Sequence, residues 1–240
     1  MSALSRHGIA FVNHYAPLHY LPFIARSGAL QSKPSLRALG FSDCHFRSKS
    51  RGQDDARGFG EYVHLTLHPN PPILAAKLGG GFPHFRLEIP SSSIEAVGFD
   101  LCRYNVAMTR QLRKGEKPGH QPSDVNGRYY GDMQIPVART DSDQSVMIAE
   151  AIKQGWMIEV LALQDLPLPD DSRVVCYSQA DAHLAQHILA AVGRPWPVSL
   201  HNGGNSYTAH PNHDRSVRQF IELALGDAEW KGNCLEFDRV

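Results

Sequence analysis

A single carboxylate interrupts the most apolar segment of the sequence, residues 156–163 (WMIEVLAL). Such a segment predicts a buried strand, in which Glu159 shares a face with Met157 and Leu161 because successive side chains alternate between faces. A residue facing water would normally have other polar residues beside it, so the pattern favours a pocket over a solvent-facing strand edge. Burial raises the pKa of a carboxyl group unless a cation or hydrogen bonds compensate, so Glu159 is a candidate catalytic residue.

His14 is the second candidate, and it lies in an alternating segment near the N-terminus, residues 9–15 (IAFVNHY). A lone histidine on a strand is more often structural than functional. Here it precedes a segment with helical spacing, residues 18–27, and an Arg-rich polar stretch follows at residues 42–60. The combination with Glu159 favours a functional role.

Basic residues are concentrated in residues 103–117 (RYNVAMTRQLRKGEK), which contain five Arg or Lys side chains and one Glu. The whole chain has 24 Lys and Arg against 24 Asp and Glu, so no net field attracts nucleic acid. Phosphate binding would therefore need a local cluster of this kind. A solvated face is the alternative interpretation of the same run.

Histidines offer a competing chemistry. His183 and His187 are four residues apart in a segment with helical periodicity, and His201, His210 and His213 follow it. Histidines on one helix face could begin a zinc site. The pair lacks the internal Glu of the metalloprotease motif, and chance pairs are expected among 13 histidines, so we expect no bound metal.

Short strands and short helices must position these residues. The expected strands are residues 9–15, 61–67, 84–89, 156–163 and 174–177, and the expected helices are residues 18–27, 73–78, 144–153, 179–192 and 215–225. Residues 90–93 predict a turn, residues 94–105 predict short extended pieces, and the stretch from residue 196 to the last helix predicts a loop. Because strands and helices follow one another without regular alternation, the sequence predicts an α+β fold.

Length and composition limit the class of protein. The chain has 240 residues, of which 42% are hydrophobic and 20% charged, so it can bury one full core. We expect a single domain over residues 1–240, with a core at about 7–193 and a C-terminal loop and helix at 194–240. The four cysteines form no CxxC pair, and no apolar run would span a membrane or serve as a signal peptide, which together predict a cytoplasmic protein with reduced thiols.

Three segments follow one another in an informative order. They are residues 12–33 (VNHYAPLHYLPFIARSGALQSK), 61–74 (EYVHLTLHPNPPIL) and 157–175 (MIEVLALQDLPLPDDSRVV). By their order and spacing they resemble the DarT-type DNA ADP-ribosyltransferases, toxins whose fold is similar to that of poly(ADP-ribose) polymerases. The resemblance implies an ADP-ribosyltransferase-like fold, with short strands in a split mixed sheet and peripheral helices.

The same resemblance implies a reaction and its residues. The protein would transfer ADP-ribose from NAD+ to a nucleic-acid base, in single-stranded DNA or in RNA, as a toxin or anti-phage effector. Glu159 would be the catalytic glutamate and Arg51 the second catalytic residue, with Arg47 and Arg57 as alternatives to Arg51. NAD+ would be bound by His14, Asn13, Tyr62 and Gly28. The placement of basic and aromatic residues along the chain, rather than the resemblance, predicts that the nucleic acid is bound by Arg47, Arg57, Arg110, Arg113, Lys114, Arg128 and Tyr130.

These residue types suit that chemistry. Cleavage of the nicotinamide glycosidic bond builds positive charge on the ribose, which a carboxylate stabilises more in the transition state than in the ground state. The chain departs from the family's pattern at Asn70, where a basic residue is usual, and at His64 and Thr66, where aromatic residues or Pro are expected. The acceptor and the existence of an antitoxin stay open. A zinc-binding hydrolase and an inert interaction module of the same fold are the alternatives.

Overall fold

The computed structural model describes residues 2–39, 58–69, 83–103, 137–155 and 157–201. Within these residues eight strands form a mixed sheet in the order β10-β9-β4-β1-β3-β7-β5-β6. The strands are β1 (Phe11–Pro17), β3 (Val63–Thr66), β4 (His84–Pro90), β5 (Phe99–Cys102), β6 (Val137–Ala138), β7 (Glu159–Ala162), β9 (Arg173–Cys176) and β10 (Val198–Leu200). Neighbouring strands are antiparallel except for β9 and β10, which are parallel.

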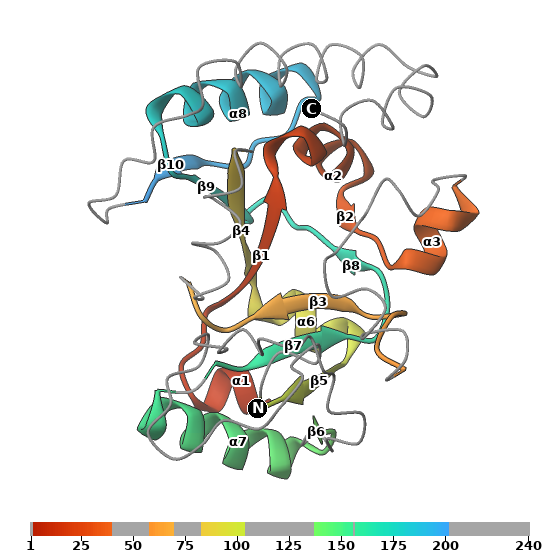
Figure 1. Ribbon diagram of the computed structural model, residues 1–240, viewed down its shortest axis with the longest axis vertical. Coiled ribbons are helices and arrows are strands. Elements are labelled where there is room, and N and C mark those ends of the chain that lie inside the picture. Colours follow the sequence, from red (N-terminus) through yellow and green to blue (C-terminus); the bar gives the residue numbers. More distant parts are fainter. Residues whose placement is uncertain (1, 40–57, 70–82, 104–136, 156, 202–240) are drawn as a thin grey trace, which may run out of the picture.

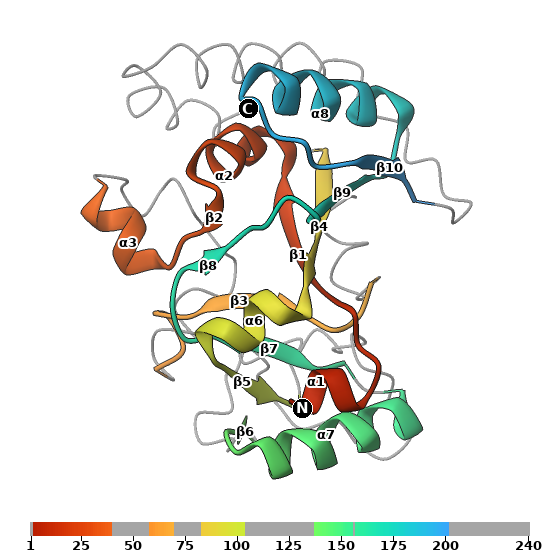
Figure 2. The ribbon, with the colours of Figure 1, turned by 180° about the vertical axis from the view of Figure 1, so that it is seen from behind.

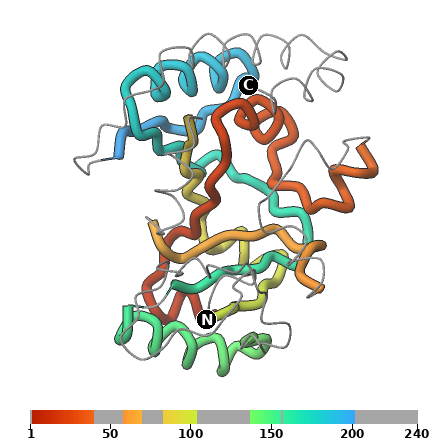
Figure 3. Tube along the Cα trace, viewed as in Figure 1, coloured from red at the N-terminus to blue at the C-terminus, as the bar shows by residue number. Residues whose placement is uncertain are grey.

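The sheet is split between β1 and β3. These two strands share the single register pair Asn13 and Thr66, whereas β1 pairs with β4 along its whole length. β1 and β4 run steeply in the view of Figure 1, and β3 and β7 cross below them (Figure 1). The tube trace shows the same change of direction (Figure 3). We call β10-β9-β4-β1 the upper half-sheet and β3-β7-β5-β6 the lower half-sheet, and this arrangement confirms the expected split mixed sheet of an α+β fold.

Helices cover the two half-sheets separately. They are α1 (Ala3–Arg6), the 3-10 helix η1 (Leu18–Tyr20), α2 (Leu21–Ser27), α3 (Lys33–Ala38), α6 (Ser91–Val97), α7 (Asp141–Gln154) and α8 (Gln179–Ala191). α8 packs on α2, β9 and β10, and α7 packs on α1, β5 and β6. Seen from behind, these two groups lie at opposite ends of the molecule (Figure 2). A two-stranded sheet of β2 (Ala29–Leu30) and β8 (Leu166–Pro167) lies beside them.

Local signals fix three of the helix ends. The Ser178 hydroxyl accepts a hydrogen bond from the Asp181 amide at 3.1 Å and begins α8. Gly28 ends α2 with a φ of 67°, and Gly155 ends α7 with a φ of 66°, both in the left-handed region that favours glycine. These ends depend on short-range chemistry, so they are readable from sequence.

Two expectations about the elements are wrong. Residues 90–93 and 94–105 predict a turn and extended pieces, but α6 occupies Ser91–Val97 and β5 follows it. Pro90 precedes the helix with a φ of -52°, and Ile94 is completely buried, so tertiary packing converts a turn signal into a helix start. The second error is β10, which lies in the expected loop after residue 196 and pairs with β9. The expected helices at 73–78 and 215–225 lie outside the described residues.

Candidate active site at the split of the sheet

Glu159 lies at the start of β7, between β3 and β5, and is 8% exposed. Its register partners are Thr66 on β3 and Cys102 on β5. The Thr66 hydroxyl donates to the carbonyl of Ile158 at 3.1 Å, which ties β3 to the beginning of β7. Glu159 is therefore on a central strand, and the alternative of a strand edge facing water is wrong.

His64 contacts the Glu159 carboxylate directly. Its Nδ1 lies 3.0 Å from Glu159 Oε1, and its Nε2 lies 2.8 Å from the carbonyl oxygen of Phe59. A carbonyl oxygen only accepts hydrogen bonds, so Nε2 carries a proton. A second proton on Nδ1 then makes the contact a charge-assisted hydrogen bond between imidazolium and carboxylate, which compensates the burial of Glu159.

A small apolar cluster lies beside this pair on the lower half-sheet. Cys102 and Leu161 are buried, and Phe59 and Tyr62 pack against them. Burial and the negative charges of Glu159 and Asp100 raise the pKa of the Cys102 thiol well above its usual range. Cys102 is a free thiol that stays neutral, so it is not a nucleophile.

Two side chains of β1 connect the half-sheets at the split. Asn13 Nδ2 donates to the carbonyl of Thr66 at 3.3 Å and to that of Leu67 at 3.4 Å. His14 Nδ1 lies 3.1 Å from the carbonyl of His64, so it carries the proton of that hydrogen bond. The structure thus places the predicted residues Asn13 and His14 against β3, the strand that holds His64, the partner of Glu159.

Packing contacts explain the positions of Gly28 and Tyr62. A Cβ atom at Gly28 would lie 2.1 Å from Nη2 of Arg194, whose Nε donates to the Ala25 carbonyl at 2.6 Å. Tyr62 packs against Phe59 with ring centroids 6.1 Å apart. Their roles in NAD+ binding stay predictions.

Many of the predicted site residues lie outside the described residues, and so does the departure at Asn70. They are Arg47, Arg51, Arg57, Arg110, Arg113, Lys114, Arg128 and Tyr130. Of the histidines of the zinc alternative, His210 and His213 also lie outside, and His183 on α8 is hydrogen-bonded to Gln179 at 2.8 Å. In the part of the chain that the structure describes, no three His, Cys, Asp or Glu side chains are grouped as metal ligands would be. None of the helices described there has both the length and the apolar character that crossing a membrane requires.

Sequence reasoning missed the role of His64. The sequence shows it only as a departure from the family's strand pattern. Strand alternation places His64 and Thr66 on one face, but the contact with Glu159 depends on the register of β3 against β7, which pairs Thr66 with Glu159. That register joins segments 95 residues apart, so no local signal could have found it.

Comparison with solved structures identifies the architecture. No protein-family model and no curated protein sequence matches the chain. The structure is similar to Thermus sp. 2.9 DarT in complex with ADP-ribosylated ssDNA, with a TM-score of 0.54 and 14% identity over 81% of this chain and 95% of that one. It is also similar to the same protein in complex with NAD+, with a TM-score of 0.52 and 13% identity over 80% and 96% of the two chains.

A further similar structure is Thermosipho africanus DarTG in complex with ADP-ribose, with a TM-score of 0.52 and 10% identity. This match covers 80% of our chain and 50% of that one. At these identities the likeness establishes the fold alone. The chain therefore has the fold of the DarT ADP-ribosyltransferases, a mixed α+β architecture with an eight-stranded sheet and peripheral helices.

Proposed function

We propose that the protein transfers ADP-ribose from NAD+ to a base of single-stranded DNA. The observation that carries the proposal is the buried Glu159 carboxylate at the split of the sheet, bonded to His64 Nδ1 at 3.0 Å. The DarT fold supports it, because Thermus sp. 2.9 DarT has been solved with NAD+ and with ADP-ribosylated ssDNA.

In the proposed reaction the bond between the nicotinamide nitrogen and C1′ of the ribose breaks, and its electron pair leaves with nicotinamide. An acceptor atom of the base then forms a bond to C1′ and loses its proton to solvent. The transition state carries positive charge on the ribose. Glu159 stabilises that charge and binds a ribose hydroxyl, so its contribution grows as the glycosidic bond lengthens.

His64 acts as a positioning residue for Glu159 in this proposal. The imidazolium fixes one carboxylate oxygen, and the Phe59 carbonyl fixes the imidazole ring in turn. If Nδ1 loses its proton, a lone pair faces the carboxylate and the contact becomes repulsive.

The remaining roles follow the sequence prediction. Asn13, His14, Tyr62 and Gly28 bind NAD+, Arg51 orients the acceptor, and Arg47 and Arg57 bind the nucleic acid together with Arg110, Arg113, Lys114, Arg128 and Tyr130. These side chains offer guanidinium and ammonium groups for phosphates and a ring for base stacking. The biological role that fits this reaction is that of a toxin with a cognate antitoxin, and residues 1–240 would form a single domain.

The direct test is incubation of the purified protein with radiolabelled NAD+ and single-stranded oligonucleotides of varied base content. We expect label to enter at least one DNA oligonucleotide, and Glu159→Gln to abolish the signal while Glu150→Gln, an exposed position on α7, leaves it unchanged. If label enters RNA alone, the acceptor is RNA rather than DNA. Absence of label in every nucleic acid, with NAD+ still bound, would refute the proposal.

A further inference from the structure

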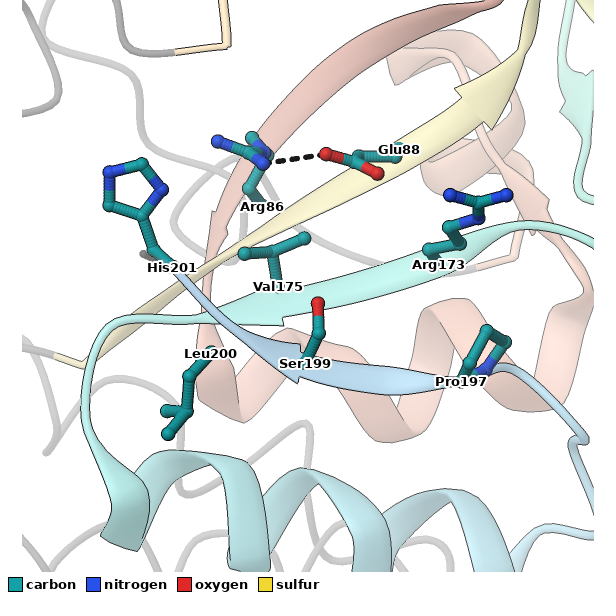
Figure 4. A pocket seen from close by; sticks show the side chains of 8 residues that line it. All are labelled: Arg86, Glu88, Arg173, Val175, Pro197, Ser199, Leu200 and His201. Carbon is teal, nitrogen blue, oxygen red and sulfur yellow. Dashed lines mark hydrogen bonds and ion pairs between the residues drawn. The ribbon is translucent and has the colours of Figure 1, made fainter. Parts of the chain in front are cut away.

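An open pocket of about 570 Å³ lies on the upper half-sheet, away from Glu159. Its side chains come from β4, β9, β10 and the residues beside β10 (Figure 4). The lining residues are Arg86, Glu88, Arg173, Val175, Pro197, Ser199, Leu200 and His201. Its volume is in the range of sites that hold a small ligand rather than a single ion.

A series of register pairs connects the pocket to Glu159 across the sheet. Arg173 pairs with Glu88, and Glu88 pairs with Asn13. Asn13 pairs with Thr66, which in turn pairs with Glu159. The two sites are thus separated by four interstrand steps of about 4.8 Å, and the bend at the split shortens the direct path.

The guanidinium groups of the pocket are held in place before any ligand binds. Arg86 Nη1 donates to the carbonyl of Pro69 at 2.7 Å, and its Nη2 donates to Glu88 Oε1 at 2.6 Å (Figure 4). The guanidinium carbon of Arg173 lies 4.5 Å above the ring centre of Phe11. Donors fixed in this way lose little conformational entropy on binding, which favours affinity.

The pocket attracts negative charge. Its carboxylate, Glu88, is already bonded to Arg86, whereas Arg173 on the neighbouring strand adds a second guanidinium. Burial and the positive charge of Arg86 lower the pKa of His201, whose ring packs against Tyr177 with centroids 5.4 Å apart. Burial disfavours any charge there, but the positive potential of Arg86 is the part that a bound anion would offset.

The walls of the pocket indicate what else the ligand carries. Val175, Pro197 and Leu200 supply apolar surface, and the Ser199 hydroxyl and the His201 ring supply polar atoms and a flat face. An inorganic anion uses only the guanidinium groups. A nucleotide contacts both the guanidinium groups and the apolar side of the pocket. Its phosphate lies at the guanidinium groups, and its sugar or base lies against the apolar side.

We propose that this pocket binds the phosphate group of a nucleotide unit, and that the unit belongs to the single-stranded nucleic acid whose base reacts near Glu159. The assignment of the nucleotide unit to this nucleic acid rests on the proposed function. Because only four register steps separate the pocket from the carboxylate, a strand anchored by one phosphate in the pocket can extend across β1 toward the split.

The test measures binding of a fluorescent single-stranded DNA oligonucleotide in the absence of NAD+, by anisotropy. We expect Arg173→Glu to raise the Kd about 10-fold or more, as expected for loss of a charge-assisted contact, and to lower the salt slope by about 0.7. Arg173→Lys should give an intermediate Kd, because it keeps the charge and loses the planar fork. The control Lys153→Glu makes the same change of net charge on α7, at the opposite end of the molecule, and should leave the Kd within about twofold.

A pH series gives a second, independent readout. A bound phosphodiester favours protonated His201, so binding should tighten as the pH falls from about 7.5 to 5.5, while Arg86 and Arg173 stay charged and Glu88 stays bonded to Arg86. His201→Ala should flatten this dependence. A wild-type Kd that does not change with pH would contradict the role of His201.

Two ligands distinguish the sources of the phosphate. If Arg173→Glu weakens NAD+ binding and not oligonucleotide binding, the pocket serves the dinucleotide and the acceptor part is wrong. If it weakens neither, the pocket proposal is overturned. The protein could also bind the oligonucleotide through Arg173 and yet show no transferase activity. That result would support the pocket proposal and refute the proposed function, so the two failures are distinguishable.

Discussion

The two half-sheets bury charges of opposite sign. The lower half-sheet buries the carboxylates Glu159 and Asp100, at 8% and 5% exposure, and the upper half-sheet buries the guanidinium of Arg86 at 6%. Each charge has a partner: His64 for Glu159, Arg139 at 3.4 Å for Asp100, and Glu88 for Arg86. Burial without partners would cost several kcal/mol for each ion, so these pairs are what makes both environments stable.

This difference fits the two tasks that we propose for the sheet. A buried carboxylate stabilises a cation that develops during a reaction, and a buried guanidinium binds an anion that is already present. The halves meet at the single pair of Asn13 and Thr66, so each can keep its own strand direction and its own electrostatic environment. The comparison predicts that variants of the lower half change turnover, whereas variants of the upper half change stability or binding.

The largest effect is expected at the centre of the lower half. Glu159→Gln should lower the rate of ADP-ribose transfer by about 10² to 10³, because it removes one group that stabilises the transition state. The rate is measured with labelled NAD+ and a saturating oligonucleotide, and the thermal transition checks that the fold is kept. Wild-type turnover in this variant would remove Glu159 from the mechanism.

In the upper half of the molecule, we expect a substitution at Gly28 to change stability. Gly28→Ala is expected to lower the free energy of unfolding by about 2 kcal/mol, since alanine is strained at a φ of 67° and its Cβ displaces Arg194. The matched variant Gly155→Ala has the same backbone strain at the end of α7 and no atom within 4 Å of the new Cβ, so it should cost about 1 kcal/mol. Urea unfolding measures both. Equal losses would mean that Arg194 moves aside without cost.

The contact between His64 and Glu159 should appear in turnover rather than in NAD+ binding. His64→Phe should lower kcat about 10-fold with little change in the KM for NAD+, because one charge-assisted hydrogen bond is lost. His64→Asn can still donate to the carboxylate and should recover part of the loss. A purely structural histidine would instead change stability, and His64→Asn would then recover none of the lost kcat.

The smallest effect concerns the split itself. His14→Ala should weaken NAD+ binding about fivefold, because it removes an imidazole that the proposed function assigns to NAD+, and should change stability little, because Asn13 still joins β1 to β3. Calorimetry compares the affinity of the two proteins for NAD+. Equal affinities would assign His14 to joining the half-sheets rather than to the cofactor.

The sequence by itself determined the features that short-range chemistry controls. The apolar run around Glu159 predicts a buried strand with one carboxylate, and Ser178 and Gly155 mark helix ends where the structure has them. The order of the three segments indicates the DarT-like fold. The strand and the helix ends are readable because the residues that carry them are neighbours along the chain, and the resemblance is readable because it rests on the order of segments along the chain.

Only the tertiary structure decided which distant residues meet. The pairing of Thr66 with Glu159 brings His64 to the carboxylate, and the pairing of β9 with β4 and β10 brings Arg173 to Arg86 and His201. The start of α6 after Pro90 and the three-residue strand β10 were missed for the same reason. A strand that slips by one residue turns every side chain to the other face, so such contacts depend on register between distant strands, which the packing of the whole sheet sets.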